Sequence, residues 1–119
     1  MAKKIDDVFL DASLDKVATC VTITVCSAEP ANFAGIAALA LAAASLVGGD
    51  FTNANGDTSG RKVTTAQKAS LAITANGTAT HVVKDDGVNI VVTTCTSQAL
   101  TSGGTVTIPA HDLEIADPL

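Results

Sequence analysis

Apolar positions near the start of the chain recur at helical spacing. Leu10, Leu14 and Val17 fall on one stripe, with Phe9 alongside, and the positions between them are mostly polar or charged. An aspartate at position 6 or 7 can cap a helix here and favours its positive end. The pattern predicts one short N-terminal helix that ends near Thr19.

From Cys20 to Cys26 the period changes to two. Val21, Ile23 and Val25 alternate with cysteines and threonines, which predicts a strand with one buried face and a threonine-lined outer face. A strand would hold Cys20 and Cys26 about 20 Å apart on the same face, so they cannot bond to each other. Cys95 can therefore reach only one of them.

The apolar run from Ile36 to Val47 consists mainly of alanine. Alanine favours a helix, whereas the alternation of Leu39 and Leu41 suits a buried strand, and we expect the strand. The run is shorter than the roughly 20 residues that a bilayer span requires. A buried element is therefore the expected structure, and we expect no membrane partner.

Turn-forming residues dominate the stretch from Asp50 to Gly60. Asn53, Asn55 and Asp57 alternate as calcium ligands do, but threonines occupy the positions of the sharp-turn glycine and the closing glutamate. The stretch is interpreted as an ordered surface loop and not as a metal site.

The second half of the chain has the pattern of a β-meander. A strand around Leu71 is followed by Asn76-Gly77, a strong hairpin signal, and strands are then expected over Thr78–Lys84 and Val88–Cys95. From Thr105 to Ile115 the apolar positions change phase beside Pro109, which predicts a bulge or bend. Residues 1–119 are thus expected to form one domain, a compact antiparallel β-sandwich or barrel with the single N-terminal helix.

Composition and charge limit both the core and the partners. The chain has no Trp or Tyr and only three Phe, and its hydrophobic content of 47% is mostly Ala and Val, so the core is expected to be modest and to need support from subunit contacts. A net charge of −5 with seven scattered basic residues argues against a nucleic-acid partner.

The candidate chemical groups are few, and we expect no enzyme and no cofactor. His81 and His111 have no Cys or Glu at metal-ligand spacing. A pair of Cys95 with His81 is interpreted as a core or surface pair, since one thiol and one imidazole do not make a nucleophilic site without further support. Asp85-Asp86 is a turn signal, and the acidic residues from Asp112 to Asp117 are expected on a solvated face.

The odd number of cysteines leaves two alternatives open. In a protein made in the cytosol, the thiols are expected to be reduced and buried. The other alternative is a disulfide between subunits, formed after release into an oxidising medium. The candidates for it are Cys20, Cys26 and Cys95.

Several stretches, spread in order over most of the chain, resemble a family of small virion structural proteins of tailed bacteriophages. These stretches are Val25–Pro30, Gly49–Thr52, Asn55–Val63, Gly77–Val82, Thr93–Gly103 and Ile115–Pro118. The alanine-rich run from Ile36 to Val47 departs from the family's pattern.

The resemblance implies a capsid decoration (cement) protein. Such a protein binds the outer surface of an HK97-type shell, with the major capsid protein and copies of itself, as a homotrimer, for partners. It would be made in the host cytoplasm and located on the virion. The resemblance brings no catalytic, cofactor-binding or metal-binding residue with it. The threonine-rich faces and the N-terminal helix are the expected contact surfaces.

Two alternatives remain at the level of the sequence. The first is another virion location, as a tail or fibre-associated protein that contacts the host. The second is a carbohydrate-binding module of similar architecture, which the absence of Trp and Tyr disfavours because sugar sites stack aromatic rings on the pyranose face.

Overall fold

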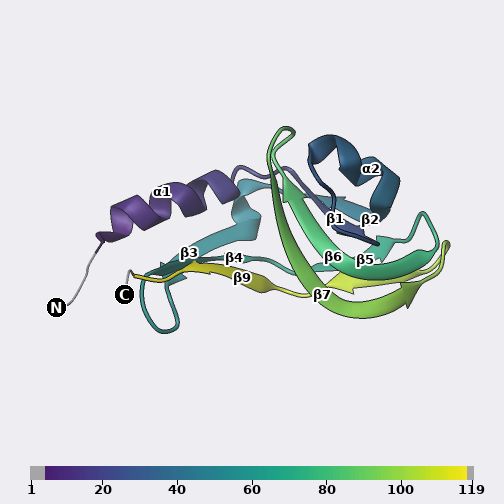
Figure 1. The fold of residues 1–119 in the computed structure, drawn as a ribbon. Helices are drawn as coiled ribbons and strands as arrows, with labels where there is room; N and C mark the ends of the chain where they lie inside the picture. The colour runs from purple at the N-terminus through teal and green to yellow at the C-terminus, as the bar shows by residue number, and fades with distance from the viewer. Residues whose placement is uncertain (1–4, 118–119) are drawn as a thin grey trace.

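The computed structural model describes residues 5–117 and has a mainly β fold of antiparallel sheets (Figure 1). The helices are α1 (Asp7–Val17) and α2 (Ile36–Leu39), with 3-10 turns at Phe33–Gly35 and Gly48–Asp50. The strands are β1 (Thr22–Cys26), β2 (Ala40–Ser45), β3 (Phe51–Asn55), β4 (Arg61–Thr65), β5 (Lys68–Ala72), β6 (Gly77–Asp85), β7 (Ile90–Leu100), β8 (Thr105–Ile108) and β9 (His111–Ile115). The expected fold class, a mainly β antiparallel structure with an N-terminal helix, is confirmed.

Within the described residues the strands form three sheets, in the orders β2-β1-β6-β7, β3-β4-β9 and β5-β8. Figure 1 shows α1 lying along the β3-β4-β9 sheet, while the strongly curved β6 and β7 wrap around the other end of the molecule. The overall dimensions are 53 × 25 × 25 Å. The molecule is therefore elongated, with the helix and the curved strands at opposite ends.

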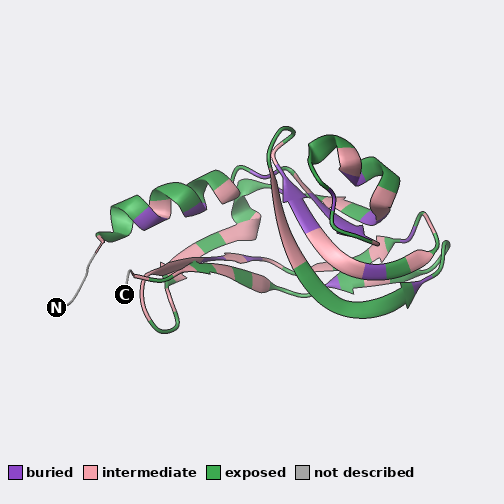
Figure 2. Ribbon diagram, viewed as in Figure 1, coloured by how far each residue is buried: buried purple, intermediate pink, exposed green. Residues whose placement is uncertain are grey.

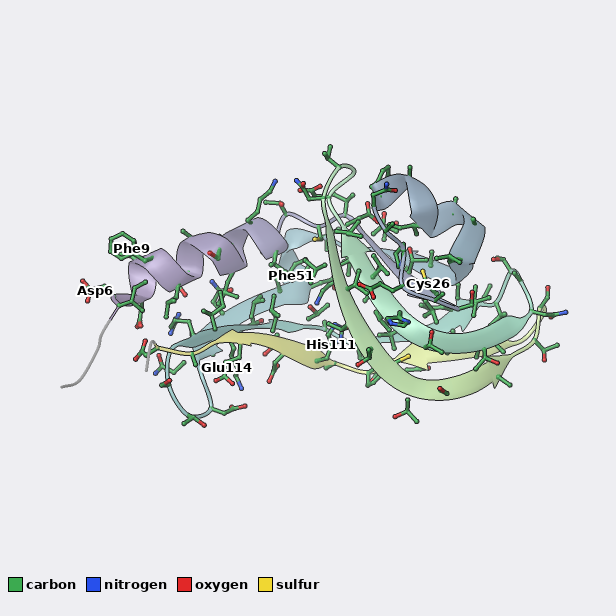
Figure 3. The ribbon with its side chains drawn as sticks, viewed as in Figure 1. Asp6, Phe9, Cys26, Phe51, His111 and Glu114 are labelled. Atoms are coloured by element: carbon green, nitrogen blue, oxygen red, sulfur yellow. The ribbon has the colours of Figure 1, made fainter. Side chains whose placement is uncertain are left out.

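Helix α1 forms where the apolar spacing predicts it. Leu10 and Leu14 are buried on the side that packs against β4. Asp6 occupies the N-cap position, and the helix ends at Val17, close to the expected end. Phe9 does not join the buried stripe: it is 65% exposed and points away from the sheet (Figure 3).

Strand β1 lies in the middle of its sheet and is buried on both faces, which corrects the expected threonine-lined outer face. Ile23 and Val25 belong to the main core, whereas Thr24 and Cys26 are buried on the opposite face. Cys26 packs there with Ile36 of α2 and with Val83 of β6. The segment around α2 therefore covers the face that the sequence pattern assigned to solvent.

The run from Ile36 to Val47 forms a short helix and then a strand, the two structures that its sequence favours. Helix α2 ends at Leu39, and the backbone changes to the extended conformation at Ala40, where β2 begins. The strand prediction is correct for the second half of the run and wrong for the first. Among the described residues, no helix is long and apolar enough to cross a membrane.

The stretch from Asp50 to Gly60 is only partly a loop, contrary to expectation. Phe51–Asn55 is strand β3, which pairs with β4. The loop is limited to the residues between Asn55 and Arg61, where Gly56 donates its backbone N–H to the carbonyl of Gly60. Polar side chains in β3 find partners on α1 and β4. Residues that are typical of turns therefore form an edge strand here.

The predicted hairpin at Asn76-Gly77 is wrong. β5 pairs with β8, and β6 pairs with β1 and β7, so the strands on the two sides of Asn76-Gly77 lie in different sheets. Asn76 instead accepts a hydrogen bond from the backbone of Ser102, and a Cβ added at Gly77 would lie 2.9 Å from a methyl of Leu41. Both residues serve tertiary contacts and not a tight turn.

The predicted bend at Pro109 is confirmed as a change of sheet. β8 ends at Ile108 and pairs with β5, whereas β9 begins at His111 and pairs with β4. The phase change in the apolar pattern marks this step from one sheet to another. β7 extends to Leu100, five residues past the expected end at Cys95.

The main core lies between the four-stranded sheet and the β5–β8 pair. It consists of small and aliphatic side chains: Cys20, Ile23, Val25, Leu41, Ala42, Leu46, Ile73, Ala79, Leu100 and Ile108. No Phe among the described residues is fully buried, since Phe9 and Phe33 are exposed and Phe51 is half-buried. The core is modest, as the composition predicts.

Candidate functional site

A groove lies between β7 and the link that joins β8 to β9. Its volume is about 430 Å³, and it is lined by Thr93–Thr96 on one side and by Ile108, Pro109, His111 and Asp112 on the other. A second hollow of about 240 Å³ shares Val82, Cys95, Thr96, Ile108 and Pro109 with the first. Together they form a continuous depression under the curve of β7.

β7 forms one wall of the groove and is the edge of its sheet. Between the pairs Ala79↔Gln98 and His81↔Thr94, the single residue Thr80 of β6 faces Cys95, Thr96 and Ser97 of β7. A bulge of this kind bends a strand and redirects its side chains. The bulge accounts for the way β7 bends away from β6 at Cys95, Thr96 and Ser97.

The exposed part of β7 is unusually long. All six residues from Thr94 to Ala99 are exposed, so both faces of the strand are open to solvent (Figure 2). The strand also has a free edge, and backbone groups at a free edge are a template for pairing with another chain. This segment contains no charged residue.

Behind the groove lies a buried polar contact that joins two sheets. Lys84 of β6 is only 1% exposed, and its Nζ lies 3.1 Å from Thr65 Oγ1 on β4 and 3.1 Å from His111 Nε2 on β9. Figure 3 shows His111 between the α1-covered sheet and the curved strands. Burial lowers the pKa of Lys84, because desolvation disfavours its charged form.

The two histidines do not fill the role of a base for Cys95. His81 places Nδ1 2.8 Å from the hydroxyl of Thr80, and it does not line the groove that contains Cys95. His111 does line that groove, but both of its ring nitrogens are engaged, Nδ1 with the carbonyl of Pro109 and Nε2 with Lys84. Burial also raises the pKa of the Cys95 thiol, which lowers its thiolate fraction.

The three cysteines are free thiols in different surroundings. Cys20 and Cys26 are buried, and Cys95 is exposed. Burial raises the pKa of both buried thiols. Cys20 and Cys26 are buried as expected, their reduced state stays a prediction, and a disulfide between subunits is sterically open only to Cys95.

The calcium-like residues serve other contacts. Asn53 donates to Asp15 of α1, Asn55 accepts from Arg61, and Asp57 pairs with Lys62 at 2.8 Å. Two of these three side chains thus face a cation of the protein itself. Within residues 5–117, no group of three or more His, Cys, Asp or Glu side chains is arranged to hold a metal ion.

The acidic residues of β9, Asp112 and Glu114, are exposed as expected but are also paired, whereas Asp117 is half-buried. Asp112 accepts from Thr64 and contacts Lys62, and Glu114 accepts from the backbone N–H of Asp57. The hydrogen bond from the Thr64 hydroxyl is the largest cause that lowers the pKa of Asp112, and Lys62 lowers it further. His111 and Asp112 reach opposite sides of β9, as their adjacency in a strand predicts.

Neither the burial of Lys84 nor the groove is among the features that the sequence predicts. A signal for Lys84 was present, because strand alternation places Lys84 on the same face as Val82, which lines the groove. No local signal reports its partners, since Thr65 and His111 lie 19 and 27 residues away in the chain.

Comparison with known proteins adds no relative on which a role could be based. No protein-family model, no curated protein and no solved structure matches the chain.

Proposed function

We propose that the chain is a structural subunit that works by packing against neighbouring protein chains. The main support for this proposal is the edge segment Thr94–Ala99 of β7, which is exposed on both faces and uncharged. A strand in this state gains buried area and hydrogen bonds when another chain covers it. The outer side of α1 offers a second apolar surface, where Val8 and Phe9 are 70% and 65% exposed.

The distribution of positive charge supports a protein partner over a nucleic acid. Of the five basic residues in the described range, Lys16, Arg61, Lys62 and Lys68 each pair with an aspartate. The fifth, Lys84, is buried. Phosphate recognition depends on accessible, clustered cations, and residues 5–117 present none that is both exposed and unpaired.

The assembly we propose is the head of a tailed bacteriophage. The resemblance to small virion proteins includes Thr93–Gly103, which covers the exposed part of β7. In this role the chain is a decoration protein, a homotrimer bound to the major capsid protein on the outer surface of the shell. It adds contact area where capsid subunits meet and so resists the internal pressure of packaged DNA.

The proposal is tested by adding the purified protein to expanded empty shells and measuring their resistance to heat. Thr96→Lys places a charge in the middle of the exposed β7 segment, and Thr58→Lys places the same charge in the exposed loop between β3 and β4. We expect the wild-type protein and Thr58→Lys to bind and stabilise the shells, and Thr96→Lys to bind poorly.

Both variants should retain the stability of the free chain within about 0.5 kcal/mol, because both sites are on the surface. Equal heat resistance of shells with and without the wild-type protein would overturn the decoration role. Binding to isolated tails instead of heads would move the subunit to the tail and leave the packing role intact.

A further inference from the structure

Lys84 forms a polar link between the four-stranded sheet and the β3-β4-β9 sheet. Lys84 extends from β6 and donates to Thr65 on β4 and to His111 on β9, each at 3.1 Å. Thr65 is fully buried and Lys84 is nearly so. Solvent is therefore excluded from the Lys84 and Thr65 ends of these bonds, and the two sheets depend on them locally.

The hydrogen bonds of His111 fix its protonation state. Nδ1 lies 3.0 Å from the carbonyl oxygen of Pro109, and a carbonyl can only accept, so Nδ1 carries the hydrogen. Nε2 then has a lone pair, which accepts from the Lys84 amine. With the Lys84 ammonium as the donor, the arrangement thus requires a neutral imidazole.

The charged groups around this contact only weakly compensate a second cation: Asp112 favours a proton on His111, but less than burial and Lys84 disfavour it. Asp112, the nearest carboxylate in the chain, is directed to Thr64 and Lys62, and Asp85 accepts from the backbone of Gly87. The Cys20 thiol near Lys84 is protonated, because burial raises its pKa. Cys95, which shares the groove with His111, is also a thiol of raised pKa.

We propose that the Lys84–His111 contact is an acid-sensitive link between the two sheets. When His111 takes up a proton at Nε2, the acceptor for Lys84 is lost and two hydrogen-bond donors, both cationic, face each other. The link then opens and loosens β4 and β9 from β6. The proton can reach His111 because its half-buried ring lines the groove.

The direction of the pH effect follows from the surroundings of His111. Burial is the largest cause that lowers its pKa below the ordinary value; Lys84 lowers it further, while Pro109 and Asp112 act the other way. The unfolded chain therefore binds a proton at a higher pH than the native chain. The contribution of His111 to stability is fully present above about pH 6.5, the ordinary pKa of histidine, and is lost as the pH decreases.

The test is urea unfolding between pH 5 and 7.5 of three proteins: wild type, His111→Gln and His81→Gln. Glutamine at position 111 retains an acceptor oxygen for Lys84 but cannot titrate. We expect the wild type and His81→Gln to lose stability to the same extent as the pH falls over this range, and His111→Gln to lose less. An equal loss in wild type and His111→Gln would overturn the proposal.

A second measurement uses the wild-type protein alone and so does not depend on the folding of a variant. Nitrogen NMR should show His111 with its hydrogen on Nδ1 at pH 7.5 and titrating below the ordinary pKa. Amide exchange, corrected for its intrinsic pH dependence, should then accelerate at pH 5 in β4 and β9 before it does in the β1–β6 pair. Hydrogen on Nε2, or equal acceleration in both regions, would contradict the link.

Discussion

Asp86 fixes the turn between β6 and β7 and attaches the end of α1 to it. Its Oδ1 accepts from the backbone N–H groups of Val88 at 2.9 Å and Asn89 at 2.7 Å. Its Oδ2 lies 2.8 Å from Lys16 Nζ at the end of the helix. Lys16 and the two N–H groups lower the pKa of Asp86, because each favours the ionised carboxylate.

The stabilising effect of Asp86 is therefore expected to depend on pH. A carboxylate whose pKa is lower in the native state stabilises the fold above its unfolded pKa of about 3.9, and the effect is lost as the pH falls further. Asp86→Asn should be less stable than wild type at pH 5, and the difference should shrink toward pH 2. Urea unfolding of both proteins measures it, and a constant difference over this range would contradict the assignment.

At the scale of the elements, the loop between β3 and β4 depends on a glycine. Gly60 has a φ of +71°, in the left-handed region that favours glycine. A Cβ at this position would also collide with the carbonyl of Ile115 on β9. The turn can approach β9 this closely only because residue 60 has no side chain.

We expect Gly60→Ala to destabilise the protein by about 1–3 kcal/mol, the usual cost of such a backbone conformation, or more because of the collision. Gly48→Ala is the matched control, since a Cβ at Gly48 meets no atom within 4 Å. Thermal or urea unfolding gives both values. Equal effects of the two substitutions would show that the conformation at Gly60 is not required.

The elements also show which parts of the fold a sequence can predict. Periodicity predicts α1 and the change of sheet beside Pro109, because local spacing decides which side chains are buried there. The Asn76-Gly77 dipeptide misleads, because a turn signal is local whereas β5 pairs with β8, more than thirty residues further along the chain. The buried Thr24 and Lys84 likewise depend on segments distant in sequence, which no local pattern encodes.

On the scale of the whole molecule, Cys95 is a natural reporter of contacts between subunits. It is the exposed cysteine, and it lies in the β7 segment proposed to pack against neighbours. A thiol reagent should modify one cysteine per chain in the free native protein and all three after unfolding. Cys95→Ser should remove the fast reaction, while Cys26→Ser should not.

In the assembled state, the proposed packing predicts that Cys95 becomes protected or joins a disulfide between subunits. A non-reducing gel of assemblies distinguishes the two, since a disulfide gives oligomer bands that collapse with reductant and are absent in Cys95→Ser. Full reactivity of Cys95 in the assembly would show that β7 is not covered there.

The elongated shape and the modest core support a chain that gains stability from its neighbours. The apolar residues of the main core are mostly aliphatic, and the long edge segment of β7 is open on both faces. A partner that binds only the folded chain stabilises it by mass action. The chain should therefore unfold at a higher temperature in its assembly than alone.

The most direct test of the proposed function is the number of copies of this chain in purified phage particles, measured by quantitative mass spectrometry against the major capsid protein. A decoration protein at the subunit junctions of the shell should be present in hundreds of copies per particle. Particles that carry none of it, while the chain is abundant in the infected cell, would contradict the account.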